Sequence, residues 1–522
     1  MMEQQVNLRE EVLLLLIDID RKKVMSSQGL SNLLLRYQFA KKQDRAFMTR
    51  LLEGTLEQQI YLDYVLNQFS SKKMEKQKPF IRCLLRMTAY QILFMEQVPD
   101  SAACNEAVKL ARKKGFSTLS GFVNGLLRNV ARKKDEIKLP DQKKEPMNYL
   151  SIRYSIPQWI LEEWSTMYDY ETVEKMAEGS IRNPETTVRV NLSNTELEPL
   201  KSALIEEGIQ VEEASYLSNV LKISGYDSLS RIKAFKRGFI QVQDESSATV
   251  GHIADPEGDA FVIDMCSAPG GKALHAADIM RQKGGTGRVL ARDLSDHKIS
   301  LIEDNVERCG FTNIETEVFD GTVLDETLVG KADLVICDVP CSGLGILARK
   351  NDIKYNVTKE RIEELVPLQR SILKNAAAYV KTGGTLIFST CTITKEENED
   401  NRRWLLEEFP LESVDFSNKL PEYFADQAKN GYLQLLPGIY GTDGFYIAKL
   451  EKIGDNLSKI ISDMEFIAGE VIIMRDGAVL KIDTTERLLQ EVEGKVWTAV
   501  ITHSDLNKIK RQFTIGNIIQ KS

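Results

Sequence analysis

The chain has 522 residues and a formal net charge of −8, and 28% of its residues are charged against 43% hydrophobic. This balance is ordinary for a soluble globular protein, and the length predicts roughly three or four domains. The apolar run at 12–17 is too short for a membrane span or a signal peptide, so we expect a cytoplasmic protein without a membrane partner.

The cysteines and histidines argue against disulfides and a metal site. Seven cysteines are scattered along the chain without a CxxC pair, and four histidines lie far apart in sequence. Scattered cysteines without a secretion signal are typical of reduced thiols. Structural zinc sites need closely spaced ligands, so we expect no metal.

A basic segment is hidden by the acidic net charge. Between Ser71 and Lys138 there are fifteen basic and six acidic residues, so this segment carries +9 and the rest of the chain −17. Binding to phosphates requires such a local basic surface. A helical bundle with solvated, lysine-rich faces would have the same pattern, so charge alone leaves RNA binding open.

Residues 1–140 are predicted to form an all-α bundle. Apolar residues recur at three- and four-residue spacings over 44–69, 79–99 and 119–134, which predicts a helix in each range. Pro79 stands at the start of the second helix and Pro99 after its end. The charged segment 135–149 contains two prolines and no periodicity, and it is predicted to be a linker.

Two segments with different patterns of helices and strands follow. Residues 150–255 mix helical stretches with short strands, which predicts a small α+β unit. Residues 256–452 alternate apolar strands with helices, the pattern of a doubly wound, Rossmann-like parallel sheet. In the remainder, 453–522, alternating apolar residues surround Asp476-Gly477 and predict a hairpin, and 495–503 could be another strand; we assign no chemistry to this tail.

A glycine turn follows the first strand of the predicted parallel sheet. In DMCSAPGGKALH, residues 264–275, Pro269, Gly270 and Gly271 make a tight turn that opens a helix, so backbone N–H groups can face a ligand. The turn is not GxGxxG, and many such turns are purely structural.

Three aspartates favour a ligand-binding role for this turn over a structural one. Asp293, Asp320 and Asp338 end the next three strands. Ligands bind at the carboxyl ends of such strands. There Asp293 could accept both ribose hydroxyls of an adenosine cofactor, and Asp320 would be within reach of its adenine. Each could also be a helix cap. Three in register favour a nucleoside cofactor, and the missing phosphate fingerprint favours S-adenosylmethionine over NAD.

Cys341 in DVPCSG and Cys391 in FSTCT follow strand ends on the same side as the aspartates. A thiolate there can add to an electron-poor ring carbon. Position 5 of cytosine is not nucleophilic until a nucleophile adds at position 6, so the pattern suits methylation of a pyrimidine carbon. By contrast, four other cysteines fit small apolar core residues: Cys83, Cys104, Cys309 and Cys337.

The motifs DMCSAPGGK, ICDVPCSGLG, FSTCTITKEENE and YGTDGFYIAKL together resemble the RNA 5-methylcytosine methyltransferases. LSGFVNGLLRNV in the helical part is similar to the NusB-type domain of the Fmu/RsmB branch of that family. The resemblance covers about residues 1–450. It implies methylation of one cytidine of 16S ribosomal RNA, free or partly assembled, with S-adenosylmethionine as cofactor; we expect a monomer.

The resemblance also implies roles for single residues. Cys391 would attack C6 of cytosine, Cys341 would help release the product, and Asp338 would hydrogen-bond the target base. Lys272 is our candidate for the cation that lowers the pKa of Cys391. The cofactor would be bound by Asp293, Asp320 and Asp338 together with the loop Cys266, Ser267, Ala268, Pro269, Gly270, Gly271 and Lys272.

Some alternatives stay open. Asn351 stands where relatives often have proline, which puts the target sequence in doubt, and the tail after Lys452 lies outside the usual pattern. The same chemistry could act on tRNA or another rRNA site. Cys341 could be the attacker, as in cytosine methylases of DNA. In a different class, the chain could be a non-catalytic RNA-binding, antitermination-type factor. We expect the basic bundle and the unit around Arg189 and Asn191 to hold the RNA backbone.

Overall fold

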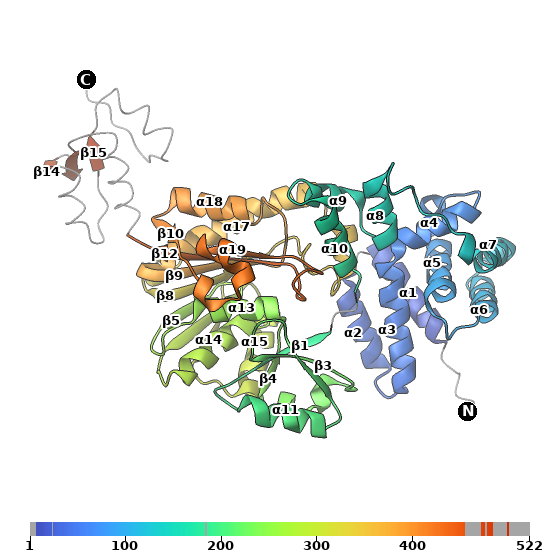
Figure 1. The fold of residues 1–522 in the computed structure, drawn as a ribbon, viewed down its shortest axis with the longest axis horizontal. Helices are drawn as coiled ribbons and strands as arrows, with labels where there is room; N and C mark the ends of the chain where they lie inside the picture. Colours follow the sequence, from blue (N-terminus) through green and yellow to red (C-terminus); the bar gives the residue numbers. More distant parts are fainter. Residues whose placement is uncertain are drawn as a thin grey trace.

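The computed structural model describes residues 7–22, 24–182 and 185–454, together with the backbone of three strands between 471 and 500. A helical N-terminal part leads through a small antiparallel sheet to a large mixed sheet (Figure 1). Within these described ranges, no helix is long and apolar enough to cross a bilayer.

The N-terminal part is a bundle around α5 (Pro79–Phe94), which contacts α1, α3, α4, α6 and α7. Nearly every residue of α5 from Ile81 to Ile92 is buried, as expected for a helix surrounded by others. Helices occupy all three ranges in which the apolar spacing predicted them. The other bundle helices are α1 (Leu8–Lys22), α2 (Ser26–Arg36), α3 (Lys42–Glu57), α4 (Gln59–Phe69), α6 (Asp100–Lys113) and α7 (Ser120–Arg132).

The single helix predicted over 44–69 is in fact two, because α3 ends at Glu57 and α4 begins at Gln59, with Gln58 between them. Lys354 Nζ donates to the Glu57 carbonyl at 2.8 Å, and Tyr355 Oη donates to the Leu56 carbonyl at 2.9 Å. Lys354 and Tyr355 stand about 300 residues later in the chain, and their hydrogen bonds take the place of helical ones at the break. Periodicity along 44–69 cannot reveal partners that lie about 300 residues away.

The predicted linker 135–149 ends in a helix, since α8 (Pro146–Tyr154) starts with a proline at its first position. After α9 (Gln158–Ser165) and α10 (Tyr170–Gly179) comes a four-stranded antiparallel sheet in the order β2-β3-β1-β4. This confirms the small α+β unit. Its elements are β1 (Thr186–Val190), α11 (Leu197–Glu206), β2 (Gln210–Glu213), β3 (Val220–Ser224), α12 (Lys233–Lys236) and β4 (Ile240–Val242).

The large sheet has eight strands, in the order β10-β12-β9-β8-β5-β6-β7 with β11 paired to β12. The run from β9 to β7 is parallel, as predicted. Its strands are β5 (Phe261–Asp264), β6 (Arg288–Asp293), β7 (Ile314–Val318), β8 (Ala332–Asp338) and β9 (Val380–Thr390). The connecting helices are α14 (Gly271–Gln282), α15 (Asp296–Cys309), α16 (Ile353–Asn356) and α17 (Lys359–Tyr379).

Both faces of this sheet are covered. α17 and α18 (Glu399–Glu408) lie on one side, whereas α14, α15 and α13 (Glu245–Ala254) lie on the other (Figure 1). Successive residues of a strand enter opposite layers: Val262 packs with the α14 side and Ile263 with the α17 side. Strands buried on both faces explain the continuous apolar runs of the sequence.

The sheet differs from the prediction at one edge, where β12 (Phe445–Lys452) runs antiparallel to β9. β10 (Leu411–Ser413) and β11 (Tyr432–Leu435) pair with it, and α19 (Ala425–Lys429) precedes β11. In the tail, β13 (Val471–Arg475) and β14 (Ala478–Asp483) pair antiparallel, which confirms the predicted hairpin strands, and β15 (Thr498–Val500) joins them. The turn residues of that hairpin lie outside the described residues.

Candidate active site

Cys341 and Cys391 lie side by side at the carboxyl ends of β8 and β9. Asp338 pairs with Ser389 in the parallel register, so the loops that carry the two thiols leave the same edge of the sheet. The two Sγ atoms are 3.3 Å apart. The hydrogen bond with Cys391 and the loss of surrounding water raise the pKa of the Cys341 thiol, so Cys341 keeps its proton at neutral pH.

Asp338 and Lys272 form a charged pair beside the thiols. Lys272 Nζ donates to Asp338 Oδ2 at 2.6 Å, and Ser389 Oγ donates to Asp338 Oδ1 at 2.8 Å. Burial on its own would lower the pKa of Lys272, but Asp338 outweighs it and the pKa is raised, with Cys391 contributing in the same direction. The structure therefore places a stable cation near Cys391, bound to Asp338.

The predicted cofactor loop joins β5 to α14, with Gly270 at the start of the helix. Gly270 has φ +97°, a conformation that favours glycine. The carboxylate of Asp293 holds the loop in place, because the N–H of Ala268 donates to its Oδ2 at 2.9 Å. Lys298 Nζ donates to the other oxygen of Asp293 at 2.7 Å. Asp293 is thus at the predicted place, and its binding to a ribose stays a prediction.

Asp320 lies in the loop after β7 and is exposed. The Thr322 N–H donates to its Oδ1 at 2.9 Å and the Thr322 hydroxyl at 2.7 Å, and the backbone hydrogen bond lowers the pKa of Asp320. This is a local turn in which the Asp320 side chain binds the residue two positions later; it does not cap a following helix. Asp320 forms no contact with the thiol pair within the described residues, and its role toward adenine stays a prediction.

Arg189 and Asn191, in the small α+β unit, lie in the interior of the protein. Both side chains are fully buried: Arg189 Nε donates to Gln243 Oε1 at 2.8 Å, and Asn191 Nδ2 donates to the Gly238 carbonyl at 2.7 Å. These two side chains are therefore structural, and RNA binding by the unit around them stays a prediction. Arg189 of β1 faces α14, where Asp278 lies 3.5 Å from it, whereas Asn191 follows the end of β1.

Family models match three parts of the chain: "16S rRNA methyltransferase RsmB/F" over 252–451, "NusB family" over 6–132, and the RsmF/B-like ferredoxin-like domain over 156–228. The probable ribosomal RNA small subunit methyltransferase B of Bacillus subtilis is 36% identical over 439 residues, covering 83% of this chain and 97% of its own. The chain belongs to the RsmB/F methyltransferase family. The resemblance found in the sequence motifs is confirmed.

One further relative and two solved structures are similar to this RsmB/F chain. The probable methyltransferase B of Synechocystis is 31% identical over 453 residues, covering 86% of this chain and all of its own. The crystal structure of PH0851 superposes with a TM-score of 0.70 at 25% identity, over 86% of this chain and 99% of that one. NSun6 from Pyrococcus horikoshii, solved with SFG, shares the fold at a TM-score of 0.50 and 22% identity, over 57% of this chain and 99% of its own.

Asp264, at the end of β5, is a site residue that the sequence reasoning missed. It is fully buried, and neither carboxylate oxygen has a hydrogen-bond partner in the described part of this RsmB/F chain. Burial raises the pKa of Asp264 to about 7. Burial of a carboxyl group without hydrogen-bond partners costs folding free energy, unless a bound ligand supplies the missing partner. Its position as a strand-end acid, directly before the glycine turn, was the available signal.

The residues present fit S-adenosylmethionine. This cofactor carries an ammonium and a sulfonium group, and the edge of the sheet offers the carboxylates of Asp264, Asp293 and Asp338. The Ser267 hydroxyl is also without a partner among the described residues. Loop 266–272 would hold the cofactor, with the helix N-terminus of α14 facing it.

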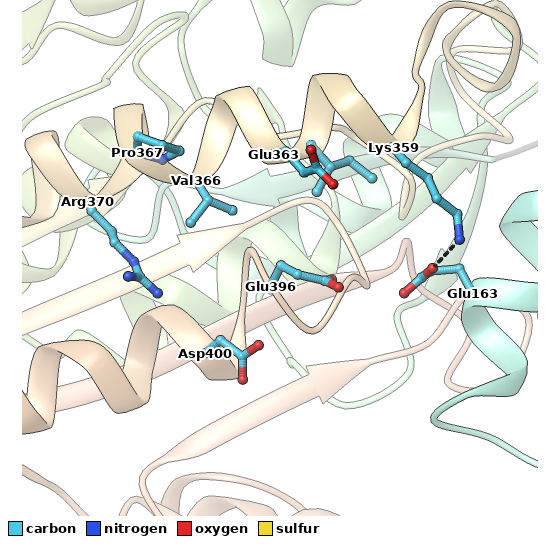
Figure 2. Close-up of a pocket in the computed structure, with 9 residues that line it drawn as sticks. Glu163, Lys359, Glu363, Val366, Pro367, Arg370, Glu396 and Asp400 are labelled. Atoms are coloured by element: carbon cyan, nitrogen blue, oxygen red, sulfur yellow. Dashed lines mark ion pairs between the residues drawn. The ribbon is translucent and has the colours of Figure 1, made fainter.

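A cavity of about 450 Å³ lies elsewhere on this RsmB/F fold, along α17 (Figure 2). Neither thiol and no residue of the glycine turn lines it. Lys359 at one end forms an ion pair with Glu163 at 3.2 Å. Glu396, in the turn before α18, and Asp400, in the first turn of α18, also line the cavity (Figure 2). It is not the site of the predicted chemistry. The lining residues are Glu163, Lys359, Ile362, Glu363, Val366, Pro367, Arg370, Glu396 and Asp400.

Proposed function

We propose that this protein methylates C5 of a specific cytidine in small-subunit rRNA through a covalent bond between Cys391 and C6. The observation that carries the proposal is the pair of thiols 3.3 Å apart, next to the Lys272–Asp338 pair. A nucleophile, a second thiol and a fixed charged pair at one sheet edge are the groups that this chemistry needs.

Each residue then has a role in the proposed reaction. The Cys391 thiolate adds to C6, Asp338 hydrogen-bonds the base while charge develops, and C5 becomes nucleophilic. S-adenosylmethionine, when bound, supplies the methyl group to C5. A base then removes the C5 proton, and the C6–S bond breaks to return the Cys391 thiolate.

The protonated state of Cys341 supports a part in product release. A neutral thiol 3.3 Å from Cys391 can donate a hydrogen bond to the sulfur that leaves. The same geometry does not suit two thiolates, because like charges so close destabilise each other. Cys391 as attacker and Cys341 as helper is therefore the assignment we propose, and the reverse assignment is its competitor.

We propose rRNA as the substrate because curated relatives at 36% and 31% identity are named as small subunit rRNA methyltransferases. The proposed division into 1–140, 150–255, 256–452 and 453–522 would leave the first two parts to hold RNA around the target. Extrusion of a base requires it to be unstacked, which is easiest in free or partly assembled rRNA. We propose that the protein acts as a monomer.

Mapping of 5-methylcytidine in total RNA tests this function. Cells that lack the protein should lose methylation at one cytidine of 16S rRNA, and re-expression should restore it. Loss of 5-methylcytidine from tRNA only would move the same chemistry to the alternative substrate. Unchanged methylation everywhere, with RNA binding intact, would favour the non-catalytic factor.

A further inference from the structure

Glu397 is a buried carboxyl group that the proposed reaction does not use. It lies between β9 and α18, six residues after Cys391, and its side chain is fully buried. Its neighbour Glu396 is exposed and faces the cavity along α17 (Figure 2). A fully buried carboxylate is costly unless hydrogen bonds compensate it, so its contacts indicate its purpose.

The contacts of Glu397 join the loops that carry the two thiols. The N–H of Ser342, directly after Cys341, donates to Oε1 at 2.8 Å, and the Ser342 hydroxyl donates to Oε2 at 2.5 Å. On the other side, the Thr394 hydroxyl donates to Oε2 at 2.7 Å. Removal of the carboxylate would leave the buried Ser342 N–H without its partner.

Gln369 and Thr392 add further contacts between the loops that carry the two thiols. Gln369 of α17 donates from Nε2 to Glu397 Oε1 at 2.9 Å and to the Pro340 carbonyl at 3.0 Å. The Ser342 hydroxyl also lies 2.7 Å from the hydroxyl of Thr392, which directly follows Cys391. The Cys341 loop and the Cys391 loop are therefore linked through the Glu397 carboxylate and through the contact between Ser342 and Thr392, next to sulfur atoms 3.3 Å apart.

The charge of Glu397 acts on one thiol in particular. The groups that face Cys341 are Cys391, Glu397 and Asp338, and the charge of Asp338 is balanced by Lys272 at 2.6 Å. Glu397 contributes to the raised pKa of Cys341, after Cys391 and desolvation. A fixed negative charge beside one of two adjacent thiols disfavours loss of the proton from that thiol.

We infer that Glu397 is a positioning residue that holds the Cys341 and Cys391 loops together and keeps the proton of the thiol pair on Cys341. It thereby determines which of the two cysteines is the attacking thiolate. This inference rests on the proposed function for its consequence in catalysis, but its two physical parts, geometry and proton placement, can be measured without RNA or cofactor.

The proton placement is tested by alkylation of the full-length protein with iodoacetamide between pH 7 and 11, followed by mass spectrometry of the two cysteine peptides. In Glu397→Gln, the pH midpoint for alkylation of Cys341 should fall by about one unit, because a like charge is lost. In the matched control Glu396→Gln it should stay at the wild-type value. An unchanged midpoint in Glu397→Gln would overturn the inference.

This readout separates the inference from simple loosening of the loops. A loop that only becomes more mobile would admit water to both thiols, so the alkylation of Cys341 and Cys391 would change together. Loss of the nearby charge should shift the midpoint of Cys341 while Cys391 changes little, and a joint change would contradict the proton placement. Gln can turn its amide toward the hydroxyls of Ser342 and Thr394, which can accept hydrogen bonds, so this variant is the mildest change available.

The positioning part is tested by kinetics. Ser342→Ala keeps the carboxylate and removes one of its donors, and Glu397→Gln removes the charge. Each should lower kcat, by up to about 100-fold for Glu397→Gln because misplacement of reacting groups by 1 Å costs that much, with KM for RNA within twofold. A folded Ser342→Ala with full kcat would refute this part. If the wild type itself does not methylate RNA, the proposed function fails while the alkylation result still decides proton placement.

Discussion

The Sγ atoms of Cys341 and Cys391 lie 3.3 Å apart although fifty residues separate them in the chain. The parallel pairing of β8 with β9 brings the two loops to one edge, and the register of Asp338 with Ser389 sets their relative height. Two thiols at hydrogen-bond distance can share one proton, which suits one attacking thiolate and one neutral helper.

The two thiols should respond differently to substitution. Cys391→Ala should abolish methyl transfer and keep binding of S-adenosylmethionine, because the nucleophile is lost while loop 266–272 is untouched. Cys341→Ala should accumulate an RNA–protein adduct that survives a denaturing gel. Cys104→Ala, a change in the helical part, serves as the control with normal turnover. An adduct in Cys391→Ala and none in Cys341→Ala would reverse the two roles.

Asp264→Asn should raise the stability of the cofactor-free protein and weaken its binding of the cofactor. The variant removes a buried carboxylate without partners, so the cofactor-free protein should gain about 1–3 kcal/mol at pH 8. The cofactor should lose affinity, seen as a smaller rise of Tm when S-adenosylmethionine is added. Equal Tm rises in the variant and the wild type would show that Asp264 does not face the cofactor.

The difference in stability between Asp264→Asn and the wild type should depend on pH. The pKa of Asp264 is about 7 in the folded protein and near 4 when unfolded, so the folded state binds more protons between these values. The wild type therefore loses stability as the pH rises from 4 to 7. The stability advantage of Asp264→Asn should be small at pH 5 and largest above pH 7 in thermal unfolding.

Local patterns predicted much of this fold. The parallel strands appear where continuous apolar runs stand in the sequence. Loop 266–272, Asp293, Asp338 and both thiols meet at one end of the sheet, because the carboxyl ends of parallel strands lie together. The sequence analysis assigns the residues of β12 only to a family motif and predicts no strand there. The strand is nevertheless buried over nearly its whole length. No local signal distinguishes an antiparallel edge strand of this kind from a parallel one.

The remaining differences depend on groups far away in sequence. The break at Gln58 is set by Lys354 and Tyr355, and the burial of Arg189 is set by contacts with α14. Glu397 looks in the sequence like any acid in an acidic stretch, KEENED, and only its convergent donors distinguish it from Glu396. Periodicity does not reveal such tertiary partners, so the helix break, the burial of Arg189 and the contacts of Glu397 were not predicted.

Gly345→Ala should disturb the nucleophile directly. A Cβ at this position would lie 2.1 Å from the Gly444 carbonyl oxygen and 2.8 Å from that of Cys391, so the backbone on one side must move. We expect an activity loss of about 100-fold or more and a lower Tm. Gly121→Ala in α7 has open space around it and should be neutral or slightly stabilising. Normal turnover in Gly345→Ala would contradict this close packing.

Lys354→Met tests the contact between the catalytic sheet and the helical bundle. Lys354 is almost fully buried, and burial lowers its pKa to about 7, whereas the unfolded value is near 10.5. The unfolded chain thus binds more protons between pH 7 and 10, so Lys354 costs most stability below pH 7 and least above pH 10. In chemical denaturation, the stability of the methionine variant relative to the wild type should fall as the pH rises from 7 to 10. A difference that does not change with pH would mean that Lys354 stays charged inside the fold, held by the Glu57 carbonyl at 2.8 Å.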